Sequence, residues 1–236
     1  MSDILAQTIQ DIVDANHILA NEGVLDGFGH VSARHPHHPD RFLISRSRSP
    51  ALVARDDIVE LDLDGEPLEP LTVGLYVERV IHGAFFRARP DVMAVSHHHA
   101  ASVMPFCQTG VPIVPVFHIG AVIGETVPFW DSRDEFGDTN MLVETLDQAH
   151  SLARACGENW SVLLRRHGAC NLGRSVREVV FRSVHLKQNA ELQFQSQALG
   201  VVSPLTSTEI ALAAQLNLGA LVQTRLWDYW KGRLAA

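Results

Sequence analysis

The stretch Ala94-Val95-Ser96-His97-His98-His99 is an apolar run that ends in three consecutive histidines. Such a run is typical of a β-strand, and side chains along a strand alternate between its two faces. We therefore expect His97 and His99 to point the same way and His98 to point the other way. Two imidazoles on one face form half of a divalent-metal site. The strand thus predicts a place in the fold that can hold a metal ion.

A third histidine follows a second apolar strand, far along the chain. Ser161-Val162-Leu163-Leu164-Arg165-Arg166 leads into His167-Gly168, where we expect the glycine to allow a tight backbone bend. Imidazoles suit zinc, iron, copper, nickel or manganese, and three protein ligands with an open position are typical of catalysis. Histidine is abundant, with 13 in 236 residues, so solvated histidines such as His35, His37 and His38 are the competing interpretation.

The composition favours one folded enzyme-sized domain over residues 1–236. Hydrophobic residues make up 46% of the chain, charged residues make up 19%, and no linker-like tract divides it. The net charge of −8 argues against a nucleic-acid partner. We find neither a signal-peptide pattern nor an apolar run of about 18 residues, so we expect a cytoplasmic protein without a membrane partner. The three cysteines have no C-x-x-C spacing, which indicates buried thiols.

Hydrophobic periodicity and capping signals predict interspersed helices and strands. The predicted strands cover residues 42–45, 92–96, 111–119 and 161–166. Within 27–34 a glycine-punctuated turn leads into a further strand, and within 58–65 an alternating strand runs into a D-G turn. The predicted helices cover residues 2–21, 76–89, 140–156 and 175–200, and a last helix opens at Thr206. The elements do not alternate strictly as strand, helix, strand. This order favours an α/β protein with a mixed sheet and helices on its faces.

Glu78 and His82 precede the histidine strand in the pattern E-x-x-x-H, followed by R-P-D-V-x-A-V-x-H-x-H at 89–99 and by the later H-G at 167–168. With this combined motif the sequence resembles the class II aldolase/adducin family over roughly residues 5–200. The resemblance implies a three-layer α/β/α fold around a central mixed, mainly antiparallel sheet.

The resemblance also implies roles for individual residues. His97, His99 and His167 would bind one divalent metal ion per subunit, Zn²⁺ or Mn²⁺, and Glu78 would be the catalytic acid/base beside it. We expect His82 to pack or to support the site, and His98 to be structural. The role of His118 is left open.

Family members are commonly tetramers with sites between subunits, so the resemblance implies a homo-oligomer here. Tyr229 is a candidate for contributing to the site of a neighbouring subunit. The aromatic cluster Trp227-Asp228-Tyr229-Trp230 suits such an interface, but packing on its own subunit is an equal alternative.

Departures from the aldolase pattern carry the functional information. Where aldolases of this family bind a sugar phosphate, this chain has His30 in place of an asparagine, Ser45-Arg46-Ser47-Arg48-Ser49-Pro50 in place of a T-x-S-G-like loop, and Tyr76-Val77 in place of two serines. Alternation puts Arg46 and Arg48 on one face, where their guanidinium groups could hold a dianionic carboxylate substrate. These features resemble the decarboxylase branch of the family.

The expected function is therefore metal-dependent decarboxylation of a hydroxy-aromatic dicarboxylate in a catabolic pathway. Examples of such a substrate are 3-hydroxy-2-methylpyridine-4,5-dicarboxylate and 3,4-dihydroxyphthalate. Glu78, or a water it orients, would donate the proton, which requires a raised pKa. His30 would hydrogen-bond a substrate oxygen. The alternatives are an aldolase or epimerase acting on a small sugar phosphate, a hydratase or dehydratase, and an adducin-like interaction module without chemistry.

Overall fold

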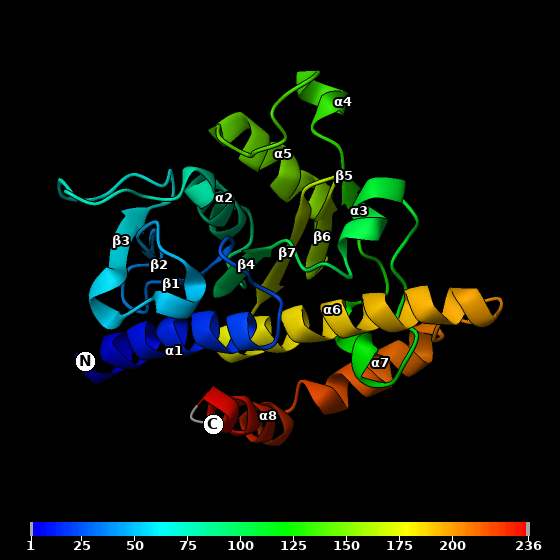
Figure 1. The fold of residues 1–236 in the computed structure, drawn as a ribbon. Coiled ribbons are helices and arrows are strands. Elements are labelled where there is room, and N and C mark those ends of the chain that lie inside the picture. Colours follow the sequence, from blue (N-terminus) through cyan, green and yellow to red (C-terminus); the bar gives the residue numbers. More distant parts are fainter. Residues whose placement is uncertain (1, 235–236) are drawn as a thin grey trace.

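Seven strands form one sheet in a computed structural model that describes residues 2–234 (Figure 1). The strand order is β3-β2-β1-β4-β7-β6-β5, and every neighbouring pair is antiparallel except β5 and β6. The strands are β1 (His30–Arg34), β2 (Arg41–Ser45), β3 (Ile58–Asp62), β4 (Ala94–His98), β5 (Phe129–Trp130), β6 (Ser161–Leu164) and β7 (Gly168–Gly173). The expected mixed, mainly antiparallel sheet is confirmed.

Helices cover both faces of this sheet, as Figure 1 shows. On one face lie α1 (Ser2–Asn21), α6 (Val176–Leu199) and α8 (Ala220–Leu234), and on the other lie α2 (Val80–Ala88) and α5 (Leu146–Cys156). A hydrophobic core lies on each face of the sheet, and successive side chains of β2 alternate between the two cores. Leu43 packs into the core on the α1 and α6 side, whereas Phe42 and Ile44 pack into the core on the α2 and α5 side. The three-layer α/β/α expectation is confirmed.

Local capping explains where the later helices begin. Thr145, Ser175 and Thr206 each accept a hydrogen bond from the backbone N–H three residues on, and each stands directly before a helix. The helix predicted from residue 140 therefore starts only at Leu146. Two helices follow Thr206, namely α7 (Ser207–Asn217) and then α8. The remaining short elements are α3 (Met104–Thr109), α4 (Arg133–Phe136), and the 3₁₀ turns η1 (Pro50–Leu52), η2 (Arg55–Asp57), η3 (Val77–Arg79) and η4 (Ile119–Ile123).

The strand predicted over residues 111–119 is wrong. The segment does not join the sheet, because side chains of α6 satisfy its backbone instead of a neighbouring strand. The N–H of Val114 donates to Gln193 Oε1 (2.9 Å), and Asn189 both accepts from the N–H of Val116 (2.9 Å) and donates to the carbonyl of Val114 (2.8 Å). Its β-branched composition therefore reflects an extended segment that is bound to a helix.

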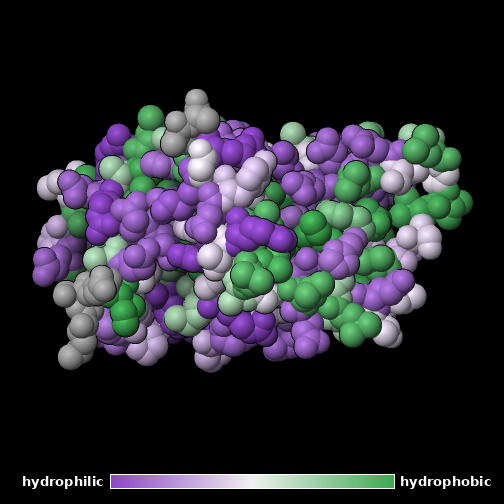
Figure 2. Space-filling view, turned by 90° about the horizontal axis from the view of Figure 1, so that it is seen from below, coloured by the Kyte–Doolittle hydropathy of each residue, from purple (hydrophilic) through white to green (hydrophobic). Residues whose placement is uncertain are grey.

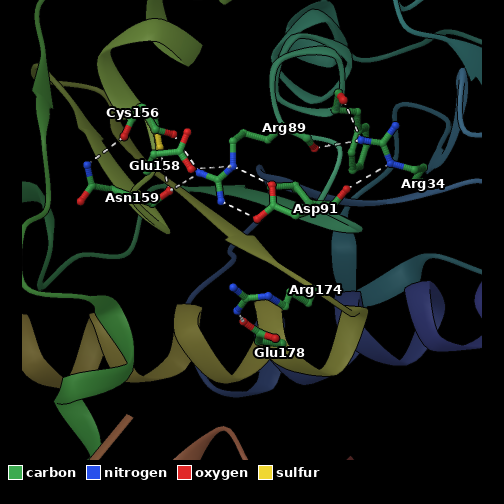
Figure 3. Close-up of polar contacts among 11 residues, drawn as sticks. Arg34, Arg89, Asp91, Cys156, Glu158, Asn159, Arg174 and Glu178 are labelled. Atoms are coloured by element: carbon green, nitrogen blue, oxygen red, sulfur yellow. Dashed lines mark hydrogen bonds and ion pairs between the residues drawn. The ribbon is translucent and has the colours of Figure 1, made fainter. Parts of the chain in front are cut away.

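Two arginines hold the connection between α2 and β4 in place (Figure 3). Arg34 donates to the carbonyl oxygens of Phe86 (2.6 Å) and Arg89 (3.0 Å). Arg89 makes a two-pronged ion pair with Asp91 (2.7 Å for both bonds) and donates to the carbonyl of Gly157 at the end of α5 (2.8 Å). Paired hydrogen bonds of this kind fix position as well as adding energy. The R-P-D segment of the motif thus sets where the histidine strand starts.

The surface carries exposed apolar side chains near the C-terminal helices. Figure 2 views the molecule from this side and shows apolar residues gathered over α7 and the end of α6. The exposed apolar residues in and next to these two segments include Leu199, Val201, Leu212 and Leu216, and Leu221 lies at the start of α8. Among the helices of residues 2–234, none combines the length and apolarity needed to cross a bilayer.

Candidate metal centre

Strand β4 delivers two imidazoles to one place by alternation. His97 is fully buried on the α2 and α5 side of the sheet, and His99 follows the end of the strand. The Nε2 atoms of His97 and His99 lie 3.1 Å apart. His98 points to the other face, where its Nδ1 accepts from the N–H of Ala100 (3.4 Å) and its Nε2 donates to Asn171 Oδ1 (2.8 Å). The predicted opposite orientation of His98 is confirmed.

His167 enters the cluster from the turn between β6 and β7. Its Nδ1 lies 2.8 Å from the carbonyl oxygen of Met141. Because a carbonyl only accepts, Nδ1 carries the proton, and Nε2 presents a lone pair to the cluster. The ring of His167 is stacked with that of His99 and meets that of His97 edge-on, with centroid distances of 5.0 and 4.9 Å.

Glu78 completes the cluster from η3, the 3₁₀ turn directly before α2. It lies in η3 at a kink, with φ −83° and ψ 16°, rather than within a regular helix. Its Oε2 lies 3.4 Å from His97 Nε2 and 3.5 Å from His167 Nε2. One nitrogen from each of the three histidines and one oxygen of Glu78 all lie within 4.8 Å of one another. The fold therefore brings together four groups that are far apart in the sequence.

These four groups fit a divalent metal ion. Two nitrogens bound to one tetrahedral zinc ion at about 2 Å lie about 3.3 Å apart, which is close to the 3.1 Å between His97 and His99. Burial, together with the charges of His97 and His167, lowers the pKa of His99 to about 3. A neutral imidazole is the form that ligates a metal. His97, His99 and His167 would hold the ion, with Glu78 beside it.

The charge state of Glu78 differs from the expectation for a proton donor. Burial alone raises the pKa of this carboxyl, but His97 and His167, which in their protonated form carry positive charge and donate to the carboxylate, outweigh burial and hold the pKa well below its usual range. The expectation of a raised pKa is therefore wrong for this arrangement. The environment favours the carboxylate, which is a proton acceptor at the start of a reaction.

The bend at His167 is made by a different residue from the one predicted. Gly168 does not have a positive φ; Arg166 does, at +54°. Gly168 is required for another reason, since a Cβ there would lie 2.3 Å from the carbonyl oxygen of His98. Met141, which holds His167, also has a positive φ of +70°. These two are the positive-φ residues other than glycine in the described chain, and both adjoin His167.

A pocket of about 420 Å³ opens onto the cluster. Glu78, His99 and His167 are among its lining residues. The other lining residues are Gly27, Phe28, Gly29, His30, Ser47, Arg48, Ser49, Tyr76, Val77 and Leu142. All three stretches that depart from the aldolase pattern therefore contribute to this wall. Sequence reasoning gave no signal for Phe28 and Leu142, because each is a lone apolar residue in a loop.

The two predicted substrate arginines differ in their positions. Arg46 donates to Asp57 Oδ1 over 2.6 Å and does not line the pocket. Arg48 lines the pocket, is partly exposed, and lies 3.3 Å from the same oxygen. The hydroxyl of Tyr76 donates to the backbone carbonyl of Arg48 and lies 3.1 Å from Ser45 Oγ. Asp57 is thus the residue that aligns both arginines, and the sequence pattern did not single it out.

His30 lines the pocket, and His82 lies behind it. The two rings share a hydrogen bond of 2.6 Å between His30 Nδ1 and His82 Nε2. Burial, together with the charge of His97, lowers the pKa of His82 to about 3, so both its nitrogens serve as neutral hydrogen-bonding groups. His82 is not part of the four-group cluster.

Tyr229 does not line this pocket. It lies in α8 and is 56% exposed. Its neighbours Trp227 and Trp230 are buried against their own subunit, where α8 packs on α1 and α6. His118 lies away from the cluster, 3.5 Å from Asn217. Any role of Tyr229 in a site requires a second copy of the chain.

Comparison with known proteins places this geometry in context. A family model described as the Class II Aldolase and Adducin N-terminal domain matches residues 10–194. The decarboxylase tropJ of Talaromyces stipitatus is 31% identical over 208 residues, covering 83% of this chain and 78% of that protein. A 3,4-dihydroxyphthalate decarboxylase of Arthrobacter keyseri is 30% identical over 238 residues, covering 94% and 92%.

Solved structures share the fold. The L-fuculose 1-phosphate aldolase from Glaciozyma antarctica superposes with a TM-score of 0.80 and is 20% identical, over 98% of this chain and 89% of that one.

Proposed function

Because the chain belongs to the class II aldolase and adducin family, we propose that it is a metal-dependent decarboxylase of a hydroxy-aromatic dicarboxylate. One observation carries this proposal: three members of a metal-fitting His and Glu cluster, namely Glu78, His99 and His167, line the same pocket as the arginine Arg48. Relatives at 30–31% identity that are named as decarboxylases support the reaction type.

The cation would be Zn²⁺ or Mn²⁺, held by His97, His99 and His167. When bound there, it supplies a Lewis acid that stabilises negative charge on a substrate oxygen.

Apolar side chains at the pocket provide a seat for the ring of the substrate. Phe28 and Val77 are exposed, at 72% and 50%, and Leu142 lies at 36%. All three line the pocket. A benzene or pyridine ring buries its faces against such groups, whereas the phosphate and hydroxyl groups of a sugar phosphate need polar partners.

Arg48 would bind the carboxylate that the substrate retains. A guanidinium group has five N–H donors, and a single ion pair with Asp57 leaves several of them for a planar carboxylate. Arg46 would act indirectly, by sharing Asp57 and so keeping Arg48 in position. The substrate-binding role of Arg46 is thus replaced by a positioning role.

Glu78 would move the proton. As a carboxylate it accepts the proton of the substrate hydroxyl, and it then delivers that proton to the ring carbon that bears the departing carboxylate. This protonation leaves a ketone next to the reacting carbon. The electron pair of the breaking C–C bond moves onto that ketone oxygen, carbon dioxide leaves, and the ring regains its aromaticity. Solvent supplies the one proton consumed overall.

The decisive assay offers the purified, metal-loaded protein 3,4-dihydroxyphthalate and 3-hydroxy-2-methylpyridine-4,5-dicarboxylate and measures released carbon dioxide. Fuculose 1-phosphate and ribulose phosphates serve as retro-aldol controls. We expect carbon dioxide from one of the dicarboxylates and no aldehyde from the phosphates. Aldehyde release without decarboxylation would replace this proposal with the aldolase function.

We further propose that the protein is a homotetramer in which Tyr229 faces the site of a neighbouring subunit. The exposed apolar residues of α7 and the end of α6 support burial against another copy (Figure 2). Light scattering of the purified protein measures the mass directly, and a monomer would contradict the assembly. Tyr229→Phe then tests the contribution of the hydroxyl group to KM.

A further inference from the structure

A buried chain of hydrogen bonds runs from the core to the pocket. Ser32 Oγ lies 2.5 Å from His82 Nδ1, and His82 Nε2 lies 2.6 Å from His30 Nδ1. Ser32 and His82 are fully buried, and His30 is 3% exposed. Ser32 and His30 are on β1 and share a face of that strand, while His82 comes from α2. The chain therefore joins two elements directly behind the candidate site.

The direction of this chain follows from the requirements of each group. In the described part of the molecule, the hydroxyl of Ser32 has the ring of His82 as its one hydrogen-bond partner. A buried hydroxyl proton without an acceptor is costly, so Ser32 donates to His82 Nδ1. The proton of the neutral His82 ring then lies on Nε2. That proton is donated to His30 Nδ1, which accepts it.

The same reasoning fixes the position of the proton on His30, which lines the pocket. With Nδ1 of His30 occupied as an acceptor, the proton of this neutral ring must be on Nε2. Nε2 has no partner in the described chain, yet it is not among the buried unpaired polar atoms, and His30 lines the pocket. This nitrogen is therefore open to the pocket.

We propose that the Ser32–His82–His30 chain fixes His30 as a neutral hydrogen-bond donor, through Nε2–H, to an acceptor oxygen of the bound ligand. His30 would touch the substrate, and His82 and Ser32 are positioning residues that select its tautomer. The identity of that oxygen, a carboxylate or ring oxygen of a hydroxy-aromatic acid, rests on the proposed function. The tautomer itself does not.

The donor role makes His30 a specificity-determining residue. A site built to donate to an oxygen discriminates against an analogue that lacks this oxygen, because the N–H is then left unpaired. A positively charged histidine would attract any anion, whereas a neutral donor of fixed direction recognises the position of one acceptor atom. The buried hydrogen-bond chain thus holds His30 as a neutral donor whose N–H points in one fixed direction.

Neutron diffraction from deuterium-exchanged crystals of the protein as purified tests the tautomers directly. Two other buried histidines are internal references. His98 must carry deuterium on Nε2, since its Nδ1 accepts from a backbone N–H, and His185 must carry it on Nδ1, which donates to the carbonyl of Phe181 (2.7 Å). We expect deuterium on Nε2 of both His82 and His30. Deuterium on Nδ1 of His30 would overturn the proposal whatever reaction the protein catalyses.

A pair of variants of the same size gives a second measurement once a substrate is known. His30→Asn keeps an N–H donor, whereas His30→Asp offers acceptors only. We expect kcat/KM of His30→Asn to stay within about tenfold of the wild type, and that of His30→Asp to fall by roughly 10- to 150-fold, the range for a lost hydrogen bond to a charged group. Equal kcat/KM values for the two variants would contradict the donor role.

Discussion

Glu78 Oε1 accepts a hydrogen bond from the backbone N–H of Val143 over 2.9 Å, while its Oε2 faces the histidine cluster. One oxygen is therefore anchored to the segment before α5, and the other is presented to the site. Because the anchor is a backbone group, the orientation of the carboxylate depends on the fold rather than on the ligands. A side chain held in this way is suited to transfer a proton between two fixed positions.

The Glu78→Gln variant separates proton transfer from architecture. An amide oxygen can still accept from Val143, so we expect an unchanged fold and nearly unchanged metal content. Turnover should fall by roughly two to four orders of magnitude, the range for a general acid/base group. Steady-state kinetics with metal analysis measures both. Turnover close to that of the wild type would remove Glu78 from the mechanism.

Adjacent histidines on opposite faces of β4 provide a matched pair for the metal site. His97→Ala should lose the bound metal, measured by elemental analysis after dialysis. His98→Gln should keep it and instead lose about 1–3 kcal/mol of stability, because the contact of His98 with Asn171 is buried. Full metal occupancy in His97→Ala would contradict the assignment of this cluster.

The two arginines should differ in their kinetic effects. Arg48→Ala is expected to raise KM by about 10- to 100-fold with a smaller change in kcat, because it removes a binding contact in the pocket wall. Arg46→Ala should raise KM less, since Asp57 can still align Arg48. The ratio of the two KM values is the measurement, and a larger effect of Arg46→Ala would reverse the proposed roles.

The backbone conformation of Arg166 predicts a stabilising substitution. At φ +54° a side chain costs about 1 kcal/mol or more relative to glycine. Arg166→Gly relieves this cost but adds the backbone entropy that glycine loses on folding, so it should raise the free energy of unfolding by up to about 1 kcal/mol in urea titrations. The control is Arg165→Gly, which has no positive φ to relieve and loses the ion pair of Arg165 with Asp131, so it should be less stable than the wild type.

The free energy of unfolding should decrease as the pH is lowered because of His185, which is buried in α6 and is not part of the Glu78 and histidine cluster. Burial lowers its pKa from 6.5 to about 4, an effect that outweighs the opposing hydrogen bond to Phe181. Between about pH 6.5 and pH 4 the unfolded chain binds a proton at this ring that the folded chain does not, so stability is full above pH 6.5 and decreases as the pH drops. The loss can reach about 3 kcal/mol. His185→Gln should flatten this part of the pH profile in urea titrations, and an unchanged slope would contradict it.

Most of the fold could be predicted from local patterns. The ranges of α1, β1, β2 and β3 follow from hydrophobic periodicity, and the starts of α6 and α7 follow from their capping residues. The strand prediction for residues 111–119 failed because the partners of their backbone groups, Asn189 and Gln193, lie more than 70 positions away in the sequence. A β-branched run looks the same in sequence whether a strand or a helix binds it.

The sequence by itself determined the alternation that separates His97 from His98, because side-chain direction along a strand has a period of two. It also carried the motif that marks Glu78 and His167. Only the tertiary structure decided that Arg46 is held by Asp57, that Arg166 rather than Gly168 makes the bend, and that Ser32 and His82 stand behind His30. Such pairings depend on distances between segments that are far apart in the chain, and no local periodicity encodes those distances.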